Sequence, residues 1–331
     1  MIYSLALTGP TASGKTALSI NLARKLSAEI ISCDSMQIYK HMDIGTAKAT
    51  ADEMAEIPHH MIDFLSPTED FSVESYRSGA VSAATDIISR GKLPLFVGGT
   101  GLYIDSIMRA PIRCVPESSR EYRDKILASV KTEDDAEALW QRLYSIDPES
   151  AEKTHKNNVR RVIRAIEIYE ATGKTKSYFD KLSKEESNDI KVEMITLDFH
   201  NRENLYKRVD ERVEIMMKQG LEDEVFALYK KGFLREGSTA AQAIGYKEII
   251  DFIEGRISLA DAVELIKLSS RRYAKRQLTW FRHEEGAYRL YLDTEEGEMR
   301  APESVFDEAC LAAEKLTKGF FNESKGTYSK A

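Results

Sequence analysis

Apolar runs of strand length alternate with amphipathic helical stretches along the first hundred residues. Buried-strand patterns occupy residues 2–7, 29–33 and 93–97, and a short apolar run covers residues 62–65. A helical pattern with one apolar face follows Ser72 and continues to about residue 90. Serine is a preferred helix N-cap residue, so we expect this helix to begin there. Strands that alternate with helices predict a parallel sheet with helices on both faces.

The pattern changes after Pro111 and Pro116. Strand patterns are absent from residues 117–186, where charged amphipathic helices take over, for example at residues 120–130 and 158–171. Strand patterns return at 192–197 and 288–292, and helical patterns cover 202–219, 221–230 and 259–282. We therefore expect one α/β domain, residues 1–113 and 190–317, with an inserted all-helical subdomain at 114–189. Residues 318–331 are small and polar and are expected to fray.

A phosphate-binding sequence lies between the first strand and the first helix. It fits the pattern G-x-x-x-x-G-K-[ST] and consists of Gly9, Pro10, Thr11, Ala12, Ser13, Gly14, Lys15 and Thr16. Glycines let the backbone wrap around an anion, and the helix N-terminus adds partial positive charge. Lys15 supplies a full charge, and the Thr16 hydroxyl is placed to bind Mg²⁺. This context predicts a phosphate site of the P-loop type in an α/β fold, rather than a turn that binds nothing. It does not identify the phosphorylated molecule.

Asp34 follows the second strand directly. Ligands of open α/β sheets bind at the carboxyl ends of strands, so Asp34 is expected to share a crevice with the phosphate loop. It is a candidate general base or hydrogen-bond acceptor for a substrate amine. A helix N-cap role is an equal alternative from position alone.

A glycine cluster, Gly98-Gly99-Thr100-Gly101, follows the strand that ends at Val97. It allows either the close approach of a ligand or a tight turn. No acidic residue ends this strand, whereas nucleotide-hydrolysing P-loop proteins use one to position Mg²⁺ and water. Asp198 ends a later strand, and its place in the sheet is open. The sequence therefore gives little support to a nucleotide-hydrolysing motor.

The composition indicates a globular protein that is not a general polyanion binder, because its formal net charge is −7. Its three cysteines, Cys33, Cys114 and Cys310, form no C-x-x-C pair. We expect reduced thiols, no zinc site and a cytoplasmic location. Met1 leads directly into the first strand, so no targeting segment is expected. The apolar runs are also shorter than a membrane-spanning helix.

Two local stretches are basic on this acidic chain. Residues 153–176 and 267–282 both concentrate lysine and arginine, and the second interleaves them with Tyr273, Trp280 and Phe281. Such stretches fit contacts to a nucleic-acid backbone. For either stretch alone, a solvated helix face paired with acidic neighbours is the more common explanation. Two stretches combined with a phosphate site favour nucleic acid.

An ordered set of motifs resembles the tRNA dimethylallyltransferases, also called isopentenyl-tRNA transferases, of the bacterial type. Besides the phosphate loop, the set comprises DSMQIYK at 34–40, MDIGTAK at 42–48, PHHMID at 58–63, GGTGLY at 98–103, NVRRVIRA at 158–165, Gly245-Tyr246 and KRQLTW at 275–280. The motifs run through most of the chain. The cysteines of the zinc finger that eukaryotic relatives add are absent.

The resemblance implies transfer of a dimethylallyl group from dimethylallyl diphosphate to N6 of adenine 37, beside the tRNA anticodon. It implies Asp34 as general base, and Lys15, Thr16 with Mg²⁺, and Arg208 as the groups that stabilise the leaving diphosphate. Thr100 matches a position near the RNA. Monomers are the family habit. Which tRNAs are modified stays open.

The resemblance also implies tRNA contacts over both predicted domains. These positions are Asp34, Ser35, Met36, Gln37, Thr100, Arg123, Arg160, Arg161, Val162, Ile163, Arg164, Ala241, Gln242, Ala243, Ile244, Gly245 and Tyr246. One alternative is a P-loop nucleoside or small-molecule kinase, which leaves the basic helices unexplained. Another is a non-catalytic tRNA-binding module, which leaves the phosphate loop unexplained.

Overall fold

The chain forms two compact units in a computed structural model that describes residues 2–109, 120–185 and 188–318. One unit comprises Met1–Met108 and Ile190–Ala331, and the other comprises Arg109–Asp189. The expected subdomain boundary at residue 114 and the tail at 319–331 lie outside the described residues.

The first unit is built on a six-stranded sheet with the order β3-β2-β4-β1-β5-β6. Its strands are β1 (Ile2–Thr8), β2 (Ala28–Ser32), β3 (His59–His60), β4 (Leu93–Gly98), β5 (Ile190–Asp198) and β6 (Tyr288–Tyr291). Every neighbouring pair is parallel. The predicted α/β fold class, a parallel sheet of the P-loop type flanked by helices, is confirmed.

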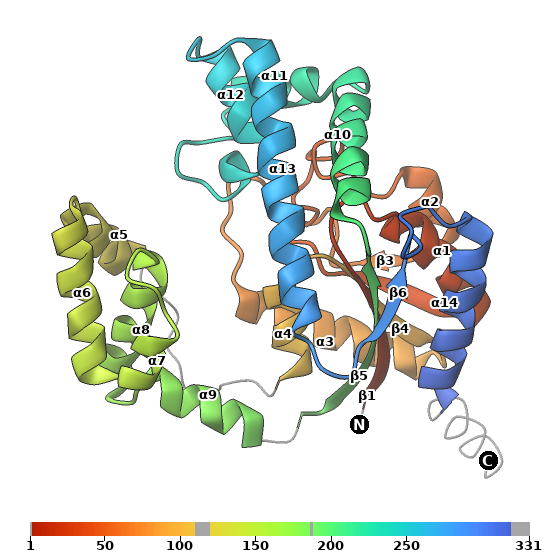
Figure 1. The fold of residues 1–331 in the computed structure, drawn as a ribbon, viewed down its shortest axis with the longest axis horizontal. Coiled ribbons are helices and arrows are strands. Elements are labelled where there is room, and N and C mark those ends of the chain that lie inside the picture. Colours follow the sequence, from red (N-terminus) through yellow and green to blue (C-terminus); the bar gives the residue numbers. More distant parts are fainter. Residues whose placement is uncertain (1, 110–119, 186–187, 319–331) are drawn as a thin grey trace. The chain divides into compact units, whose positions relative to one another are not determined.

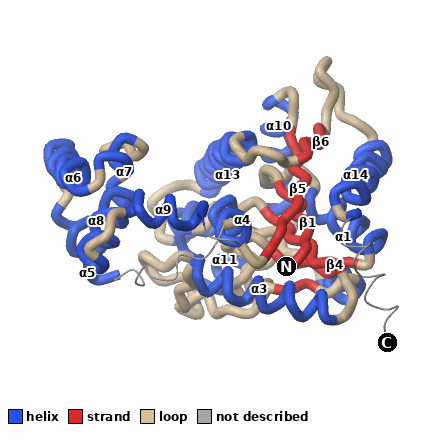
Figure 2. Tube along the Cα trace, turned by 90° about the horizontal axis from the view of Figure 1, so that it is seen from below, coloured by secondary structure: helices blue, strands red, loops and turns tan. Residues whose placement is uncertain are grey.

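Helices cover both faces of this sheet, as Figure 2 shows. Leu5 and Leu7 of β1 belong to a buried cluster with α1 (Lys15–Leu26) and α14 (Pro302–Leu316). The alternate residue Ala6 belongs to a second cluster with α3 (Val73–Ser89) and α4 (Gly101–Met108). Side chains alternate between the faces of a strand, so a strand buried on both sides is apolar at nearly every position.

Local sequence explains where several elements begin. The Ser72 side chain accepts a hydrogen bond from the Ser75 N–H and caps α3, as predicted. The apolar run at 62–65 is not a strand, and Leu65 makes only an isolated bridge with Tyr39. The edge strand is instead His59–His60, which pairs with β2.

The remaining helices of this unit are α2 (Ala51–Glu56), α10 (Arg202–Lys218), α11 (Leu221–Lys230), η1 (Ala240–Gln242), α12 (Tyr246–Ile253) and α13 (Leu259–Arg282). Figure 1 shows α10 and α13 side by side, beyond the carboxyl ends of the central strands. Val213, Met216 and Ile266 pack into an apolar cluster with α11 and α12. This second core holds α10 and α13 above the strand ends, where ligands of such sheets bind.

The second unit is helical in its described part. It contains α5 (Arg120–Ser129), α6 (Glu133–Ile146), α7 (Pro148–Glu152), α8 (Val159–Thr172) and α9 (Lys176–Glu185). Thr132 and Asp135 form a capping box at the start of α6, and Asp147 caps α7. A core of its own contains Leu143 and Ile166.

Candidate active site

The phosphate loop has a backbone that requires glycine at two positions. Gly9 has φ +144°, and a Cβ there would lie 2.9 Å from the Leu197 Cβ on the neighbouring strand. Gly14 has φ +83° and is the N-cap of α1. Both dihedrals are ones that L side chains rarely adopt. The two glycines therefore let the chain turn tightly from β1 into α1. A phosphate site requires such a turn, because it lets backbone N–H groups and the helix N-terminus face one anion.

Lys15 folds back over this loop. Its ammonium group donates to the Pro10 carbonyl oxygen at 2.6 Å and to the Ser13 hydroxyl at 3.4 Å. Burial and, to a smaller extent, the nearby Arg212 cation lower the pKa of Lys15 to about 7, while the Asp34 carboxylate opposes the shift. An anion in the loop would reverse this desolvation effect by favouring the charged lysine.

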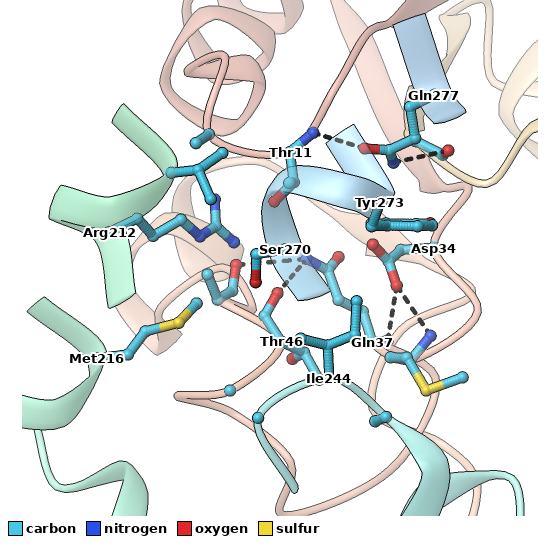
Figure 3. Close-up of a pocket in the computed structure, with 18 of the residues that line it drawn as sticks. Thr11, Asp34, Gln37, Thr46, Arg212, Met216, Ile244, Ser270, Tyr273 and Gln277 are labelled. Carbon is cyan, nitrogen blue, oxygen red and sulfur yellow. Dashed lines mark hydrogen bonds between the residues drawn. The ribbon is translucent and has the colours of Figure 1, made fainter. Parts of the chain in front are cut away.

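A pocket of about 380 Å³ adjoins the loop and gathers most of the predicted site (Figure 3). The predicted site residues that line this pocket are Thr11, Ala12, Ser13, Gly14, Lys15, Thr16, Asp34, Ser35, Met36, Gln37, Gln242, Ala243, Ile244, Gly245 and Tyr246. Gly9, Pro10, Thr100, Arg208 and Ala241 do not line it. Residues of the predicted phosphate loop, a carboxylate and a loop distant in sequence therefore face one cavity.

Two helix faces complete the pocket walls. Val209, Arg212, Val213 and Met216 lie at spacings of three, one and three on α10, and Ile266, Ser270, Tyr273 and Gln277 lie at four, three and four on α13. These spacings place each set on one side of its helix. Arg212 and Gln277 give the walls polar groups, whereas Val213, Met216 and Ile266 are apolar.

Asp34 does not cap a helix, because residues 35–38 form a turn. Its Oδ1 accepts hydrogen bonds from the backbone N–H groups of Met36 at 2.8 Å and Gln37 at 3.3 Å, which stabilises the turn after β2. Within the described residues Oδ2 makes no hydrogen bond. Thr100 is close by, because its hydroxyl accepts from the Ser35 N–H at 3.1 Å. Asp34 thus has one oxygen held by the backbone and another available to a ligand.

Arg208 and Arg212 lie one turn apart on α10. The Arg208 Nε donates to the Ala12 carbonyl oxygen at 2.8 Å, so this residue braces the phosphate loop. Arg212 lines the pocket (Figure 3) and makes no ion pair among the described residues. Burial lowers its pKa, against the attraction of Asp34. Arg212 is not among the residues predicted from the sequence, although its spacing of four from Arg208 puts it on the same helix face.

The glycines at the end of β4 and directly after it allow close packing against neighbouring segments. A Cβ at Gly98 would lie 2.2 Å from the Cys33 carbonyl oxygen, and one at Gly101 would lie 2.6 Å from the Trp280 ring. Neighbouring protein atoms, not a ligand, therefore require glycine at these two positions. Of the two alternatives for this cluster, the tight turn is the one that these contacts support.

The far wall of the pocket is fixed by Glu224 of α11. Its carboxylate accepts from the backbone N–H groups of Asp43, Ile44 and Gly45 at 2.9, 2.8 and 3.1 Å. It also accepts from the Tyr246 hydroxyl at 2.6 Å, and burial raises the pKa of this tyrosine. One side chain therefore joins two of the sequence motifs, 42–48 and 245–246.

Asp198 lies at the end of β5, next to β1 in the sheet. Arg282 holds both of its carboxylate oxygens, at 2.9 Å from Nε and 2.6 Å from the terminal nitrogen. A paired carboxylate of this kind is not available to orient a metal-bound water. Its position is close to the phosphate loop, but its role is to anchor the end of α13.

The basic stretch on α13 divides into two groups. Lys267, Arg271 and Arg282 pair with acidic residues of other segments or of α13 itself, so the structural explanation holds for them. The others line a second surface cavity, made by Arg272, Lys275, Arg276, Thr279, Trp280, His283 and Glu284. This cavity combines positive charge with an aromatic ring, as nucleic-acid sites do.

The arginines of the basic helix α8 also differ in whether they pair with acidic residues. Arg160 and Arg161 are exposed and make no ion pair among the described residues. Val162 and Ile163 are 0% and 1% exposed. Their side chains are therefore buried, and tRNA contacts at these two positions stay a prediction. Arg164 pairs with Glu167 at 2.9 Å, and Arg123 is half-buried on α5.

Thr16 fits the role of a Mg²⁺ ligand. It lines the pocket, and its hydroxyl makes no hydrogen bond among the described residues. Mg²⁺ at phosphate sites keeps several waters and is bound mainly through substrate phosphates and one or two carboxylates, to which a loop threonine hydroxyl adds one ligand. The described residues contain no cluster of three or more His, Cys, Asp or Glu side chains that could hold a metal by itself.

The parallel sheet and glycine-bounded loop define a protein of the P-loop α/β class. The IPP transferase family model matches residues 37–284, and the isopentenyl transferase model matches residues 2–63. The chain is 48% identical over 282 residues to a tRNA dimethylallyltransferase of Thermoanaerobacter sp. (strain X514), covering 85% of this chain and 89% of the relative. The chain therefore belongs to the tRNA dimethylallyltransferase family, a family of prenyltransferases, which confirms the resemblance.

Solved structures agree with this assignment. A full-length tRNA isopentenylpyrophosphate transferase from Bacillus halodurans matches with a TM-score of 0.69 and 37% identity, over 98% of this chain and 100% of that one. A eukaryotic dimethylallyltransferase acting on tRNA matches with a TM-score of 0.72 and 31% identity, over 88% and 74%. Across the part of the chain that the structure describes, no helix has both the length and the apolar character to cross a bilayer.

Proposed function

We propose that this protein transfers a dimethylallyl group from dimethylallyl diphosphate to N6 of adenine 37 in the tRNA anticodon loop, and releases diphosphate. The observation that carries the proposal is the shared pocket of Asp34, Lys15 and Arg212. A carboxylate opposite two cations fits an amine that attacks carbon while an anion departs. We place this activity in the cytoplasm and in a monomer.

Charge develops on the diphosphate as the carbon–oxygen bond breaks. Lys15 and the loop N–H groups would stabilise it, and Arg212 adds a cation that makes no ion pair among the described residues. Donors aimed at such developing charge contribute about 3 kcal/mol each. Bound Mg²⁺, held by Thr16, would supply further positive charge. Arg208 supports this set by holding the Ala12 carbonyl.

The acceptor amine needs orientation, because its lone pair is delocalised into the adenine ring. Asp34 would accept its hydrogen bond and take its proton through Oδ2, while Oδ1 stays on the backbone. The adenine must leave its stacked position in the anticodon loop to reach Asp34 in the pocket. Residues 242–246 line the pocket and are suited to replace the lost stacking contacts.

The rest of the tRNA would be bound through its backbone. Exposed Arg160 and Arg161, and Arg272, Lys275 and Arg276 of the second cavity, make no ion pair among the described residues and so offer positive charge to a phosphate backbone. Phosphate contacts of this type position the RNA without reading its sequence. The anticodon stem-loop is the substrate part that these groups suit.

The proposal is tested by mass spectrometry of unmodified tRNA after incubation with protein, Mg²⁺ and dimethylallyl diphosphate. The expected result is a gain of one dimethylallyl group on the adenosine beside the anticodon. A parallel incubation replaces the donor with ATP and adds candidate acceptors. Phosphoryl transfer without prenyl transfer would support a kinase, and tRNA binding without any mass change would support a binding module.

The base assignment is tested with Asp34→Asn, which keeps an oxygen for the Met36 and Gln37 N–H groups but accepts no proton at neutral pH. We expect kcat to fall by at least about 100-fold with tRNA affinity within about tenfold. Asp34→Ala should also abolish transfer. Asp52→Asn, an exposed change on α2, is the matched control. An Asn variant with wild-type kcat would refute the assignment.

A further inference from the structure

Gln277 of α13 joins two loops of the site through its side-chain amide (Figure 3). Its Oε1 accepts from the Thr11 N–H at 2.8 Å, and its Nε2 donates to the Gly99 carbonyl oxygen at 2.9 Å. The residue is 6% exposed. A buried side chain that satisfies one backbone donor and one backbone acceptor far apart in sequence acts as a bridge between them.

Each bridged loop carries one half of the site. Thr11 belongs to the phosphate loop, beside Lys15. On the other side, Gly99 precedes Thr100, whose hydroxyl accepts from the Ser35 N–H, next to Asp34. The two hydrogen bonds of Gln277 and the bond between Ser35 and Thr100, joined by the covalent link between Gly99 and Thr100, therefore connect the phosphate loop to the turn that carries the carboxylate.

The chemistry of the bridge is specific. A Cβ at Gly99 would lie 2.2 Å from the Gln277 Nε2, so the amide fits tightly against this loop. The two partners are an N–H donor and a carbonyl acceptor, and a neutral amide matches both at once. A carboxylate can only accept, and a thioether offers no donor.

We propose that Gln277 is a positioning residue for prenyl transfer, which keeps the phosphate loop and the Asp34 turn in a fixed position relative to each other. The inference rests on the proposed function, since it concerns alignment of the leaving diphosphate with the acceptor amine. Transfer rates depend steeply on such alignment, and a misplacement of about 1 Å costs about 100-fold. Binding of each substrate to its own half of the site depends on it much less.

The first test is Gln277→Met, which keeps the approximate length and removes both hydrogen bonds. We expect kcat to fall by at least about 30-fold, with the KM values for dimethylallyl diphosphate and tRNA each within about threefold. Glu264→Gln, an exposed position on the same helix, is the control and should leave both parameters unchanged. A wild-type kcat would overturn the inference. So would a donor KM that rises as much as kcat falls, because Gln277 would then support only the phosphate loop.

The second test is Gln277→Glu, which makes the bridge depend on pH. A protonated carboxyl accepts from the Thr11 N–H and donates to the Gly99 oxygen, as the amide does, whereas the ionised form repels that oxygen. Burial beside a carbonyl raises the pKa of the introduced carboxyl. The ratio of its kcat to that of wild type should therefore rise at least about fivefold from pH 8 to pH 6.

The ratio for Gln277→Met should stay flat over the same range. A flat ratio for both variants would overturn the inference, and Gln277→Glu alone decides it if the methionine variant does not fold. The outcomes also separate the two proposals. Wild-type protein that leaves tRNA unmodified contradicts the proposed function, whereas active wild type with fully active Gln277 variants contradicts only the bridge.

Discussion

Lys15 is a half-buried residue of the phosphate loop, and desolvation together with the Arg212 cation lowers its pKa to about 7. Bound diphosphate would raise the pKa again, so binding above pH 7 must take up a proton. Affinity for inorganic diphosphate with Mg²⁺ should therefore weaken as the pH rises from 7 to 9, by at most about tenfold per unit. Titration calorimetry measures it.

Lys15→Arg is the matched variant for this prediction, because arginine stays charged over the whole range. Ionisation of diphosphate itself affects both proteins equally. The variant should therefore show the shallower loss of affinity with rising pH. Identical pH slopes for the two proteins would contradict the lowered lysine pKa.

The residues found from sequence are those whose place in a strand–loop–helix unit fixes their surroundings. The phosphate loop follows a strand, and Asp34 ends one, so both were expected at the same sheet edge. Arg212 and Gln277 lie inside long helices. Which face of α10 or α13 meets a pocket depends on tertiary packing, and helical spacing alone does not reveal it. The same limit applies to Val162 and Ile163, because the motif at 158–165 does not indicate which of its side chains are buried.

At the scale of elements, periodicity predicted the long segments well and the short ones poorly. The limits of α13 match the predicted helix, and β1 and β4 each differ by one residue at the carboxyl end. The two-residue strand β3 carries no apolar pattern, since both residues are histidine. Its pairing depends on β2, which lies about 30 residues away in the chain. Contacts between elements, such as Arg271 with Asp210, cannot be read from a charge run.

The β2–β3 edge contains a buried carboxylate, Glu29, which is paired with Arg90, Lys92 and His60. The hydrogen bond from Arg90 is the main reason that the pKa of Glu29 is lowered to about 2, against the effect of burial. Because the folded-state pKa lies below the unfolded one, this stabilisation is present above about pH 4.5 and is lost as the pH falls toward 2.

Glu29→Gln should therefore lower the free energy of unfolding at pH 7 by about 2 kcal/mol. This value allows for the solvent screening of the partly exposed partners, which weakens each ion pair. Urea unfolding measures this difference, which should narrow between pH 5 and pH 3. Glu56→Gln, which breaks an exposed pair with Arg24, is the control and should cost less than about 1 kcal/mol. A difference that does not depend on pH would contradict the carboxylate's role.

The whole molecule carries a net charge of −7, so its overall field repels RNA. Binding must then depend on local groups whose charge is not neutralised by neighbours. On the second unit, Arg161 makes no ion pair among the described residues, whereas Lys153 is paired with Glu149 at 2.8 Å. The two residues are thus a test of whether local pairing, rather than total basic charge, determines the RNA surface.

Arg161→Ala should weaken binding of unmodified tRNA about equally for all tRNA sequences and reduce the salt slope of log K by about one unit, as expected for one lost phosphate contact. Lys153→Ala should change the slope by less than half as much, because its charge already has a partner. Filter binding between 50 and 200 mM salt gives both slopes. Equal changes would mean that total charge governs binding, and an unchanged slope for Arg161→Ala would remove this residue from the RNA surface.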